Sequence, residues 1–243
     1  ARGTRADTVG RIRLPIGEGI AGYVAEQGRA LLIEELSDHP LAERATREEA
    51  HPGSLLSVPL KVKQRILGVL NVTSKRSGQP FTSGDMKLLS ALADLAALSI
   101  ENARTYQNAI TDRLTGLYNY GYFKEQFESA LNLAREARAP LSLLMFDLDF
   151  FKNFNDKNGH ELANVVLQGV ARICRENCRQ DPGRTSDLVA RYGGEEFIIL
   201  LQGVPRQDAV RVAERIRALV EAEPFEGAEN QPGGRVTISM GVA

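Results

Sequence analysis

Cysteine and histidine are scarce in this sequence, and neither positive nor negative charge is in excess. Its 243 residues include two Cys and three His, and 30 Lys and Arg stand against 31 Asp and Glu, which leaves a net charge of −1. This balance argues against a nucleic-acid polymer held by bulk positive charge. Cys174 and Cys178 exclude a disulfide framework and a paired Cys-x-x-Cys zinc site, and we expect them to be packing residues in a protein of the reducing cytoplasm.

Long apolar runs are absent as well. The most apolar stretch, 88–100, is interrupted by Ser90, Asp94 and Ser99, so we expect no membrane span in this sequence. The chain starts without Met in a polar stretch and stops directly after a strand-like segment, and both ends are expected to be cut from a longer protein. With 43% hydrophobic residues, the sequence can still bury a core.

Three parts of the chain, 1–82, 83–111 and 112–243, differ in hydrophobic pattern. In the first part, short alternating runs predict a helix at 22–26 and strands at 11–14, 30–34, 54–62 and 67–74. In the third part, βαβ-like alternation predicts helices at 122–138, 161–179 and 206–221, and strands at 141–147, 188–192, 197–201 and 236–240. The predicted fold class is therefore α/β (α+β), with an antiparallel sheet and helices in the first domain.

The middle part has the pattern of one long connecting helix. Thr82 and Asp85 form an expected N-terminal cap, and helix-favouring residues continue to Ile110. The positions spaced alternately by four and three are Leu88, Leu92, Leu95, Ser99, Asn102, Tyr106 and Ala109, and a neighbouring face repeats this spacing. Heptad spacing predicts a coiled-coil seam between two copies of the chain, the alternative being an amphipathic helix packed on its own domain.

Two pairs of acidic residues lie beside strand-like segments. Segment 141–146 is apolar throughout, so it is expected to be a central strand covered on both faces. It leads into Asp147 and Asp149, which strand alternation places on one side if the extension continues. Glu195 and Glu196 follow two glycines that predict a tight hairpin. Carboxylates at two strand ends suggest a hard cation such as Mg²⁺, whereas either pair alone would suggest a turn with solvated acids.

Together these segments resemble the GGDEF family of diguanylate cyclases, in its GGEEF form at 193–197. The family pattern Asp-x-Asp-x-Phe-Lys-x-x-Asn-Asp-x-x-Gly-His is matched by Asp147, Asp149, Phe151, Lys152, Asn155, Asp156, Gly159 and His160, and the motif that opens the domain is matched at 112–119. The resemblance covers 112–243 and implies a nucleotidyl-cyclase-like central sheet flanked by helices.

This resemblance implies that two GTP molecules, one on each subunit of a homodimer, become cyclic di-GMP and two pyrophosphates. It implies two Mg²⁺ or Mn²⁺ ions per active site, held by Asp147, Glu196 and the Leu148 carbonyl, while Glu195 assists deprotonation of the 3′-hydroxyl. The resemblance also implies phosphate contacts from the backbone at Phe150 and Phe151 and from the charge of Lys152. It implies that Asn155 reads guanine, that Gly193 and Gly194 leave room for the nucleotide, and that His160 supports the loop.

Base recognition departs from the family pattern. The family has Gly-Asp after Gly-His, whereas this chain has Ala163 and Asn164. An Asp accepts hydrogen bonds from the guanine N1 and N2 edge, but an amide offers one acceptor and one donor group, which also matches adenine. We therefore expect ATP to be accepted beside GTP, with cyclic GMP-AMP among the products, unless a bound water restores the preference for guanine.

A second motif implies control by the product. Arg184 and Asp187 match the family's RxxD product-inhibition site, and Arg215 matches a further arginine of that site. The resemblance thus implies cyclic di-GMP as an inhibitor, and a surface salt bridge is the competing explanation. A non-catalytic receptor that binds cyclic di-GMP through Arg184 and Asp187 is the alternative function from another class.

The first part resembles the later part of a GAF sensory domain. The similar segments are 17–25, 54–60 and 68–72, within a match over 11–102. GAF domains bind varied small ligands or only dimerise, so the ligand stays open, and a signal is expected to act through the connecting helix. Family members continue past 239–243 with a helix carrying Lys or Arg for the terminal phosphates, which this sequence does not include. The prediction is a cytoplasmic, sensor-regulated dinucleotide cyclase.

Overall fold

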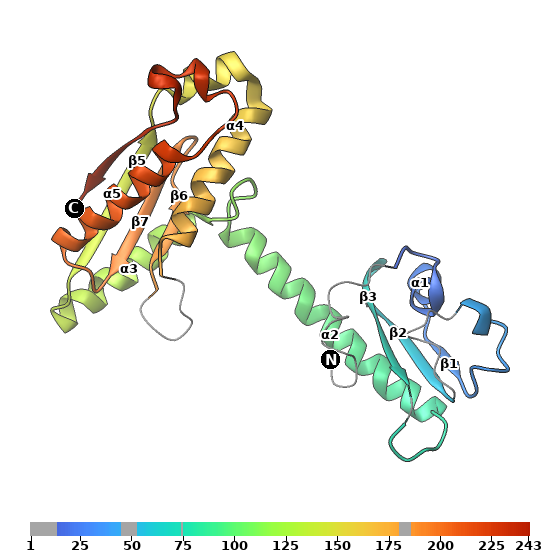
Figure 1. Ribbon diagram of the computed structural model, residues 1–243. Helices are drawn as coiled ribbons and strands as arrows, with labels where there is room; N and C mark the ends of the chain where they lie inside the picture. Colours follow the sequence, from blue (N-terminus) through green and yellow to red (C-terminus); the bar gives the residue numbers. More distant parts are fainter. Residues whose placement is uncertain (1–13, 45–52, 74, 180–185) are drawn as a thin grey trace. The chain divides into compact units, whose positions relative to one another are not determined.

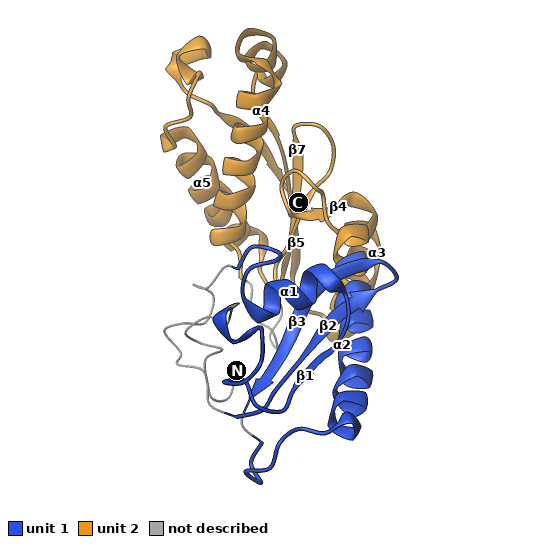
Figure 2. Cartoon of the chain, turned by 90° about the vertical axis from the view of Figure 1, so that its right-hand side faces the viewer, with its two compact units in different colours: residues 1–105 blue, residues 106–243 orange. Residues whose placement is uncertain are grey.

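The computed structural model describes residues 14–44, 53–73, 75–179 and 186–243, in two compact units, Ala1–Thr105 and Tyr106–Ala243 (Figure 2). The strand predicted at 11–14 lies, apart from its last residue, outside the described residues. The boundary between the units falls inside a long helix, and the division into 1–82, 83–111 and 112–243 stays a prediction. None of the helices in the described ranges combines the length and the apolar character that crossing a membrane requires.

Unit 1 holds the small α/β domain that the sequence predicts (Figure 1). Its elements are α1 (Gly19–Gln27), the short 3-10 helix η1 (Ala42–Arg44) and an antiparallel sheet in the order β1 (Leu31–Ile33), β2 (Leu55–Val62) and β3 (Arg65–Thr73). Ile20 of α1 packs on Ile33 and Leu55 of the sheet. A Cβ at Gly22 would lie 2.6 Å from the Pro15 carbonyl oxygen, so glycine lets α1 approach the segment that precedes it.

The long helix α2 (Ser83–Ile110) begins at the predicted cap and has two apolar faces. The Thr82 backbone amide donates to Asp85 Oδ2 at 2.8 Å, and the Asp85 amide donates to Thr82 Oγ1 at 3.2 Å. One face, with Ala93, packs on the sheet of unit 1, so the helix does cover its own domain. The predicted seam lies on another face, where Leu88, Leu92 and Leu95 are 65%, 52% and 64% exposed within the described chain.

Unit 2 is a five-stranded sheet with helices on both faces (Figure 1). The strand order is β4 (Tyr118–Asn119), β6 (Leu188–Arg191), β7 (Glu196–Gln202), β5 (Leu141–Leu148) and β8 (Ile238–Val242), and only β4 and β6 pair in parallel among these neighbours. The helices are α3 (Tyr120–Ala137), α4 (Phe151–Glu176) and α5 (Arg206–Ala222), with two 3-10 turns, η2 (Ala228–Asn230) and η3 (Pro232–Gly234). This confirms the predicted sheet flanked by helices.

Strand alternation divides the core of unit 2 into two layers. Phe197 and Ile199 of β7 point toward α4 and α5, whereas Ile198 and Leu200 point toward α3. The two cysteines are buried in the first layer, as packing residues, and burial raises the pKa of the Cys178 thiol to about 12.

Two sequence-based expectations about β5 and α4 are wrong in detail. The strand β5 is not covered on both faces along its length, because Leu144, Phe146 and Leu148 are buried on one side while Met145 on the other is 37% exposed. The helix predicted from residue 161 begins ten residues earlier, at Phe151. Its first two turns are rich in polar residues, and the buried pair that makes them helical, Phe151 and Phe154, is too short a pattern to indicate a helix by itself.

Candidate functional site

Two predicted metal ligands meet on the α3 side of the sheet. Asp147 of β5 lies directly opposite Glu196 of β7 in the antiparallel register, and directly opposed residues have Cβ atoms about 4.5–5.5 Å apart. Both side chains lie beyond the end of the face that α3 covers: Asp147 is exposed and Glu196 is half-buried. Neither carboxylate has an ion pair or hydrogen bond with another described residue, so both are available to a cation or a ligand.

The predicted Gly-Gly hairpin joins β6 to β7 and passes close to Glu196. The backbone amides of Tyr192 and Gly193 donate to the Glu196 carbonyl oxygen at 2.9 and 3.3 Å. A Cβ at Gly193 would lie 2.7 Å from Glu196 Oε2, whereas one at Gly194 would meet nothing within 4 Å. Gly193 therefore leaves room for the Glu196 carboxylate. The sequence analysis expected it to leave room for the nucleotide only. Glu195 is half-buried at the tip of the same hairpin.

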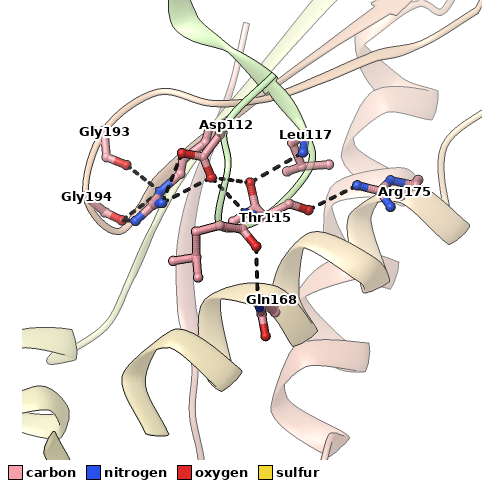
Figure 3. A network of polar contacts seen from close by, with 9 residues as sticks. Asp112, Thr115, Leu117, Gln168, Arg175, Gly193 and Gly194 are labelled. Carbon is pink, nitrogen blue, oxygen red and sulfur yellow. Dashed lines mark hydrogen bonds and ion pairs between the residues drawn. The ribbon is translucent and has the colours of Figure 1, made fainter. Parts of the chain in front are cut away.

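A network of hydrogen bonds from Arg191 ties this hairpin to the loop that opens the domain. Figure 3 labels its partners Asp112, Gly193 and Gly194. The Arg191 guanidinium donates through Nε to the Gly193 carbonyl at 3.0 Å and through Nη2 to the Gly194 carbonyl at 2.6 Å. Its Nη1 pairs with Asp112 Oδ1 at 3.1 Å, and Asp112 also accepts from the Thr115 hydroxyl at 2.6 Å. The sequence analysis assigned no role to Arg191. Its position was a signal, because Arg191 is the one charged residue of β6 and lies two residues before Gly193.

The ionisation of Asp112 reports on this network. Burial is the largest influence and raises the pKa of Asp112, but hydrogen bonds from Thr115 and the charge of Arg191 together outweigh it and hold the pKa below its ordinary value. A carboxyl group with a lowered pKa in the folded state stabilises the fold at neutral pH, and this contribution is lost as the pH falls through the lowered value. The network is therefore intact at physiological pH.

An Arg191→Ala variant is expected to lower both stability and activity. The side chains of Arg191 and Asp112 are only 17% and 24% exposed, so the variant leaves a partly buried carboxylate unpaired at a cost of about 2–3 kcal/mol. The hairpin also loses the donor to its two carbonyl groups, and we expect kcat to fall at least about tenfold. Denaturant unfolding and initial rates measure the two effects.

The matched control for this prediction is Arg211→Ala. Arg211 also pairs with an aspartate, Asp208, but its side chain is 82% exposed, and exposed pairs contribute little to stability. Equal effects of the two substitutions would contradict a special role for Arg191.

The turn from β5 into α4 is held by β8 through Asp149, whose backbone amide donates to the Thr237 carbonyl at 2.9 Å. The strand ends at Leu148, and the Asp149 carboxylate accepts hydrogen bonds from the hydroxyls of Thr237 and Ser239, both at 2.6 Å. Ser239 lies directly opposite Asp147, and Thr237, two residues earlier, is on the same face. Asp149 is therefore on Asp147's side of the sheet, as strand alternation predicts, but its carboxylate is occupied by these two hydroxyls. Asp149 also fixes the turn whose next residue, Phe150, has a φ of 55° at the N-terminus of α4.

Residues predicted to contact phosphate and base lie along α4. Lys152, His160 and Asn164 are exposed, and Asn155 is half-buried. Asn155 Oδ1 is buried without a hydrogen-bond partner, which a ligand with a donor group would satisfy. The helix is interrupted at Gly159, with φ of 83° and ψ of 166°, so Asn155 and Asn164 lie on different sides of a break.

The donor set fits a metal ion that also binds substrate. Within the described ranges, no group of three or more His, Cys, Asp or Glu residues is arranged to hold a metal. Mg²⁺ is often bound by only one or two carboxylates, with substrate phosphates and water completing its shell. Asp147 and Glu196, facing one another across two paired strands, supply that smaller set, and the Leu148 carbonyl follows on β5.

The predicted product site is only partly described, and its aspartate already has a partner. Arg184 lies outside the described residues. Asp187 is buried and accepts from Arg179 through Nη2 at 2.6 Å, Nε at 3.1 Å and the backbone amide at 2.9 Å. Arg215 Nη2 donates to the Asn177 carbonyl at 2.9 Å. The sequence analysis missed Arg179, which occupies the carboxylate that the resemblance offers to a nucleotide.

Fold and site together define an α/β domain of the nucleotidyl-cyclase type, with facing carboxylates beside a glycine hairpin. The family model described as "Diguanylate cyclase, GGDEF domain" matches residues 109–243, and a model described as "GAF domain" matches residues 1–101. The first match covers more than half of the chain. The chain therefore belongs to the GGDEF family of diguanylate cyclases.

Relatives in both sequence and structure agree with this assignment. Diguanylate cyclase A of Treponema denticola is 36% identical over 216 residues, which cover 86% of this chain and 56% of that protein. Response regulator PleD of Caulobacter vibrioides is 42% identical over 135 residues, 56% of this chain and 29% of that protein. The chain thus spans about half of the first relative and less than a third of the second.

One solved structure resembles the chain beyond the catalytic domain alone. The crystal structure of the coiled coil and GGDEF domain of DgcB from Caulobacter crescentus, in complex with c-di-GMP, has a TM-score of 0.56 and 26% sequence identity. The similarity covers 66% of this chain and 82% of that one.

Proposed function

We propose that this chain is a diguanylate cyclase that condenses two GTP molecules into cyclic di-GMP and two pyrophosphates. The single observation that carries the proposal is the register that sets Asp147 opposite Glu196 beside the Gly-Gly hairpin. Family membership and the relatives named diguanylate cyclase support it. The cytoplasm, which the cysteine usage predicts, is the proposed location.

The residues of the chain divide the chemistry between them. Asp147, Glu196 and the Leu148 carbonyl would hold the cations, Lys152 would face phosphate, and Glu195 would accept the proton of the 3′-hydroxyl. Mg²⁺ or Mn²⁺, two per site, supplies charge neutralisation on the triphosphate when bound. The backbone at Phe150 and Phe151 lies where the chain enters α4, a helix N-terminus that favours anions.

The reaction needs two copies of the chain, because each domain supplies half a site. The exposed leucine face of α2 is the surface that we propose for the homodimer, through a coiled coil. The solved structure of DgcB, described as comprising a coiled coil and a GGDEF domain, supports this arrangement. An unidentified ligand of the GAF unit would act by changing how the two helices meet.

We further propose that the site accepts ATP beside GTP and that cyclic di-GMP inhibits its own formation. Asn164 is exposed, on the far side of the break at Gly159 from Asn155, and its amide offers adenine as well as guanine a partner. For cyclic di-GMP to reach Asp187, it must displace Arg179 from the carboxylate, and Arg184 and Arg215 would then hold the phosphates.

Incubation of the full chain with Mg²⁺ and nucleotides, followed by mass spectrometry, tests the proposal. We expect GTP alone to give cyclic di-GMP and pyrophosphate, EDTA to stop the reaction, and added cyclic di-GMP to slow it. With equimolar GTP and ATP, we expect cyclic GMP-AMP as well. Only cyclic di-GMP from the mixture would contradict the role of Asn164. Binding of cyclic di-GMP without any turnover would contradict the enzyme and favour a receptor.

A further inference from the structure

A polar seam joins the loop after α5 to the first part of α4. The carboxamide of Asn158 is at its centre: Nδ2 donates to the Gly227 carbonyl at 3.3 Å, and Oδ1 accepts from Asn230 Nδ2 at 2.8 Å. Lys157 Nζ donates to the Asn230 carbonyl at 3.3 Å. We call these contacts between Lys157, Asn158, Gly227 and Asn230 the loop seam.

The loop seam depends on a close backbone approach at Gly227. This residue has a φ of 84°, which favours glycine, and a Cβ there would lie 2.8 Å from the Asn158 amide. A larger residue at this position would strain the loop and push Asn158 away. The loop also contacts the start of the helix, where Gln231 Nε2 donates to the Phe150 carbonyl at 3.3 Å.

The first part of α4, residues 151–158, needs such support because both of its ends are irregular. It follows Phe150, which has a left-handed conformation, and it ends at the break at Gly159. Two helical turns are not stable by themselves in water, and the break at Gly159 uncouples this segment from the rest of α4. Its position is therefore set by burial of Phe151 and Phe154 and by the loop seam.

Asn155 lies inside this segment and has unsatisfied hydrogen-bonding capacity. Its Oδ1 is buried without a partner, and buried acceptors are normally satisfied by protein, water or ligand. The residue before it, Phe154, offers its carbonyl to Asn158 Nδ2 at 3.0 Å, so Asn158 contacts the backbone adjoining Asn155 as well as the loop. A shift of Asn158 would be transmitted to Asn155 through this short segment.

We propose that Asn158 and Asn230 are positioning residues for base recognition, which act by holding Asn155 in the orientation that meets the nucleotide base. This inference rests on the proposed function and on the guanine-reading role that the family resemblance implies for Asn155. The family pattern Asn-Asp-x-x-Gly-His leaves position 158 open and does not include position 230, so this support is a feature of this chain's own residues.

The inference predicts a change in substrate affinity rather than in the chemical step. In Asn158→Ala and Asn230→Ala variants, we expect the KM for GTP to rise about five- to tenfold, the effect of roughly one lost hydrogen bond. The kcat should stay within about twofold, because the carboxylates at β5 and β7 are not touched. The preference for GTP over ATP should fall by a similar factor, since Asn155 no longer holds one orientation.

The experiment compares these variants of the full chain with a matched control in steady-state assays with GTP and with ATP. Asn153→Ala is the control, since Asn153 is an exposed residue of the same type in the same segment, and it should leave both nucleotides unaffected. The double variant should be no worse than Asn158→Ala alone, because the two side chains share one bond. A Gly227→Ala variant, which displaces Asn158 without removing it, should reproduce the rise in KM.

The possible outcomes separate this inference from the proposed function. An unchanged KM and base preference in Asn158→Ala, or a loss of kcat equal for both nucleotides, would overturn the positioning role. If the parent protein turns over no GTP, the proposed function fails, and calorimetric binding of GTP to the same variants then decides the inference. Weaker binding by Asn158→Ala than by Asn153→Ala supports it, and equal binding, or no binding by the parent, overturns it.

Discussion

A Glu196→Gln variant is expected to keep its fold and to lose at least about a thousandfold in the rate of cyclic di-GMP formation. The amide has the shape of the carboxylate but removes one of two facing charges, so the cations that neutralise the triphosphate are no longer held. Initial rates with GTP and Mg²⁺ measure the loss. Asp147→Asn should have the same effect, because the two side chains oppose one another across paired strands.

Stability provides a second test of the same pair. Like charges directly opposite one another on a sheet are destabilising, so without metal we expect Glu196→Gln to melt at the same temperature as the parent or higher. Mg²⁺ with GTP should raise the melting temperature of the parent but not that of Glu196→Gln, because the variant no longer holds the cations. Glu128→Gln, an exposed position on α3, is the control. A Glu196→Gln rate close to that of the control would refute the proposed metal site.

Placing two negative charges on the leucine face of α2 is expected to separate the two chains and to lower the rate of cyclic di-GMP formation. In a Leu92→Glu/Leu95→Glu double variant, the two helices of a coiled coil would bring like charges together and lose their apolar contacts. Because the proposed reaction needs half a site from each of two domains, the rate per chain at about 1 μM protein should fall at least about a hundredfold. Sedimentation velocity should show the monomer, while the circular dichroism spectrum stays the same, since both side chains are exposed.

The control for the leucine face introduces charge on the same helix away from the coiled-coil heptad positions. Lys87→Glu/Asn108→Glu changes two exposed positions outside the heptad set, and it should leave assembly and rate unchanged. Raising the protein concentration should partly restore the rate of the leucine variant. A leucine variant that remains dimeric, or a monomer with full activity, would contradict the proposed homodimer.

The sequence was sufficient for most elements, because their patterns are local. Each pattern depends only on neighbouring residues: the heptad spacing predicts α2, the alternating runs predict the strands of unit 1, and the apolar runs predict the strands of unit 2. The structure contains these elements. The beginning of α4 was missed, because Phe151 and Phe154 are its only buried residues before the break at Gly159. A helix made so short by a conformational break has too little periodicity to be recognised.

The partners of individual side chains were the least predictable part. Asp149 could be recognised as a motif residue, but its hydrogen bonds to Thr237 and Ser239 cross about ninety positions of sequence. Arg179 pairs with Asp187, which the resemblance had reserved for the product. Such contacts depend on which strands and loops become neighbours, and a residue's chemistry alone leaves several partners open to it.

Sequence by itself determined the family, the order of the elements and the chemical type of the candidate ligands, because motifs and hydrophobic periods are properties of short stretches of chain. Only the tertiary structure decided that Asp147 faces Glu196, that Arg191 links the hairpin to Asp112, and that one face of α2 covers unit 1 while its leucines remain exposed. These features depend on strand register and on the packing of segments far apart in the chain, which local patterns do not specify.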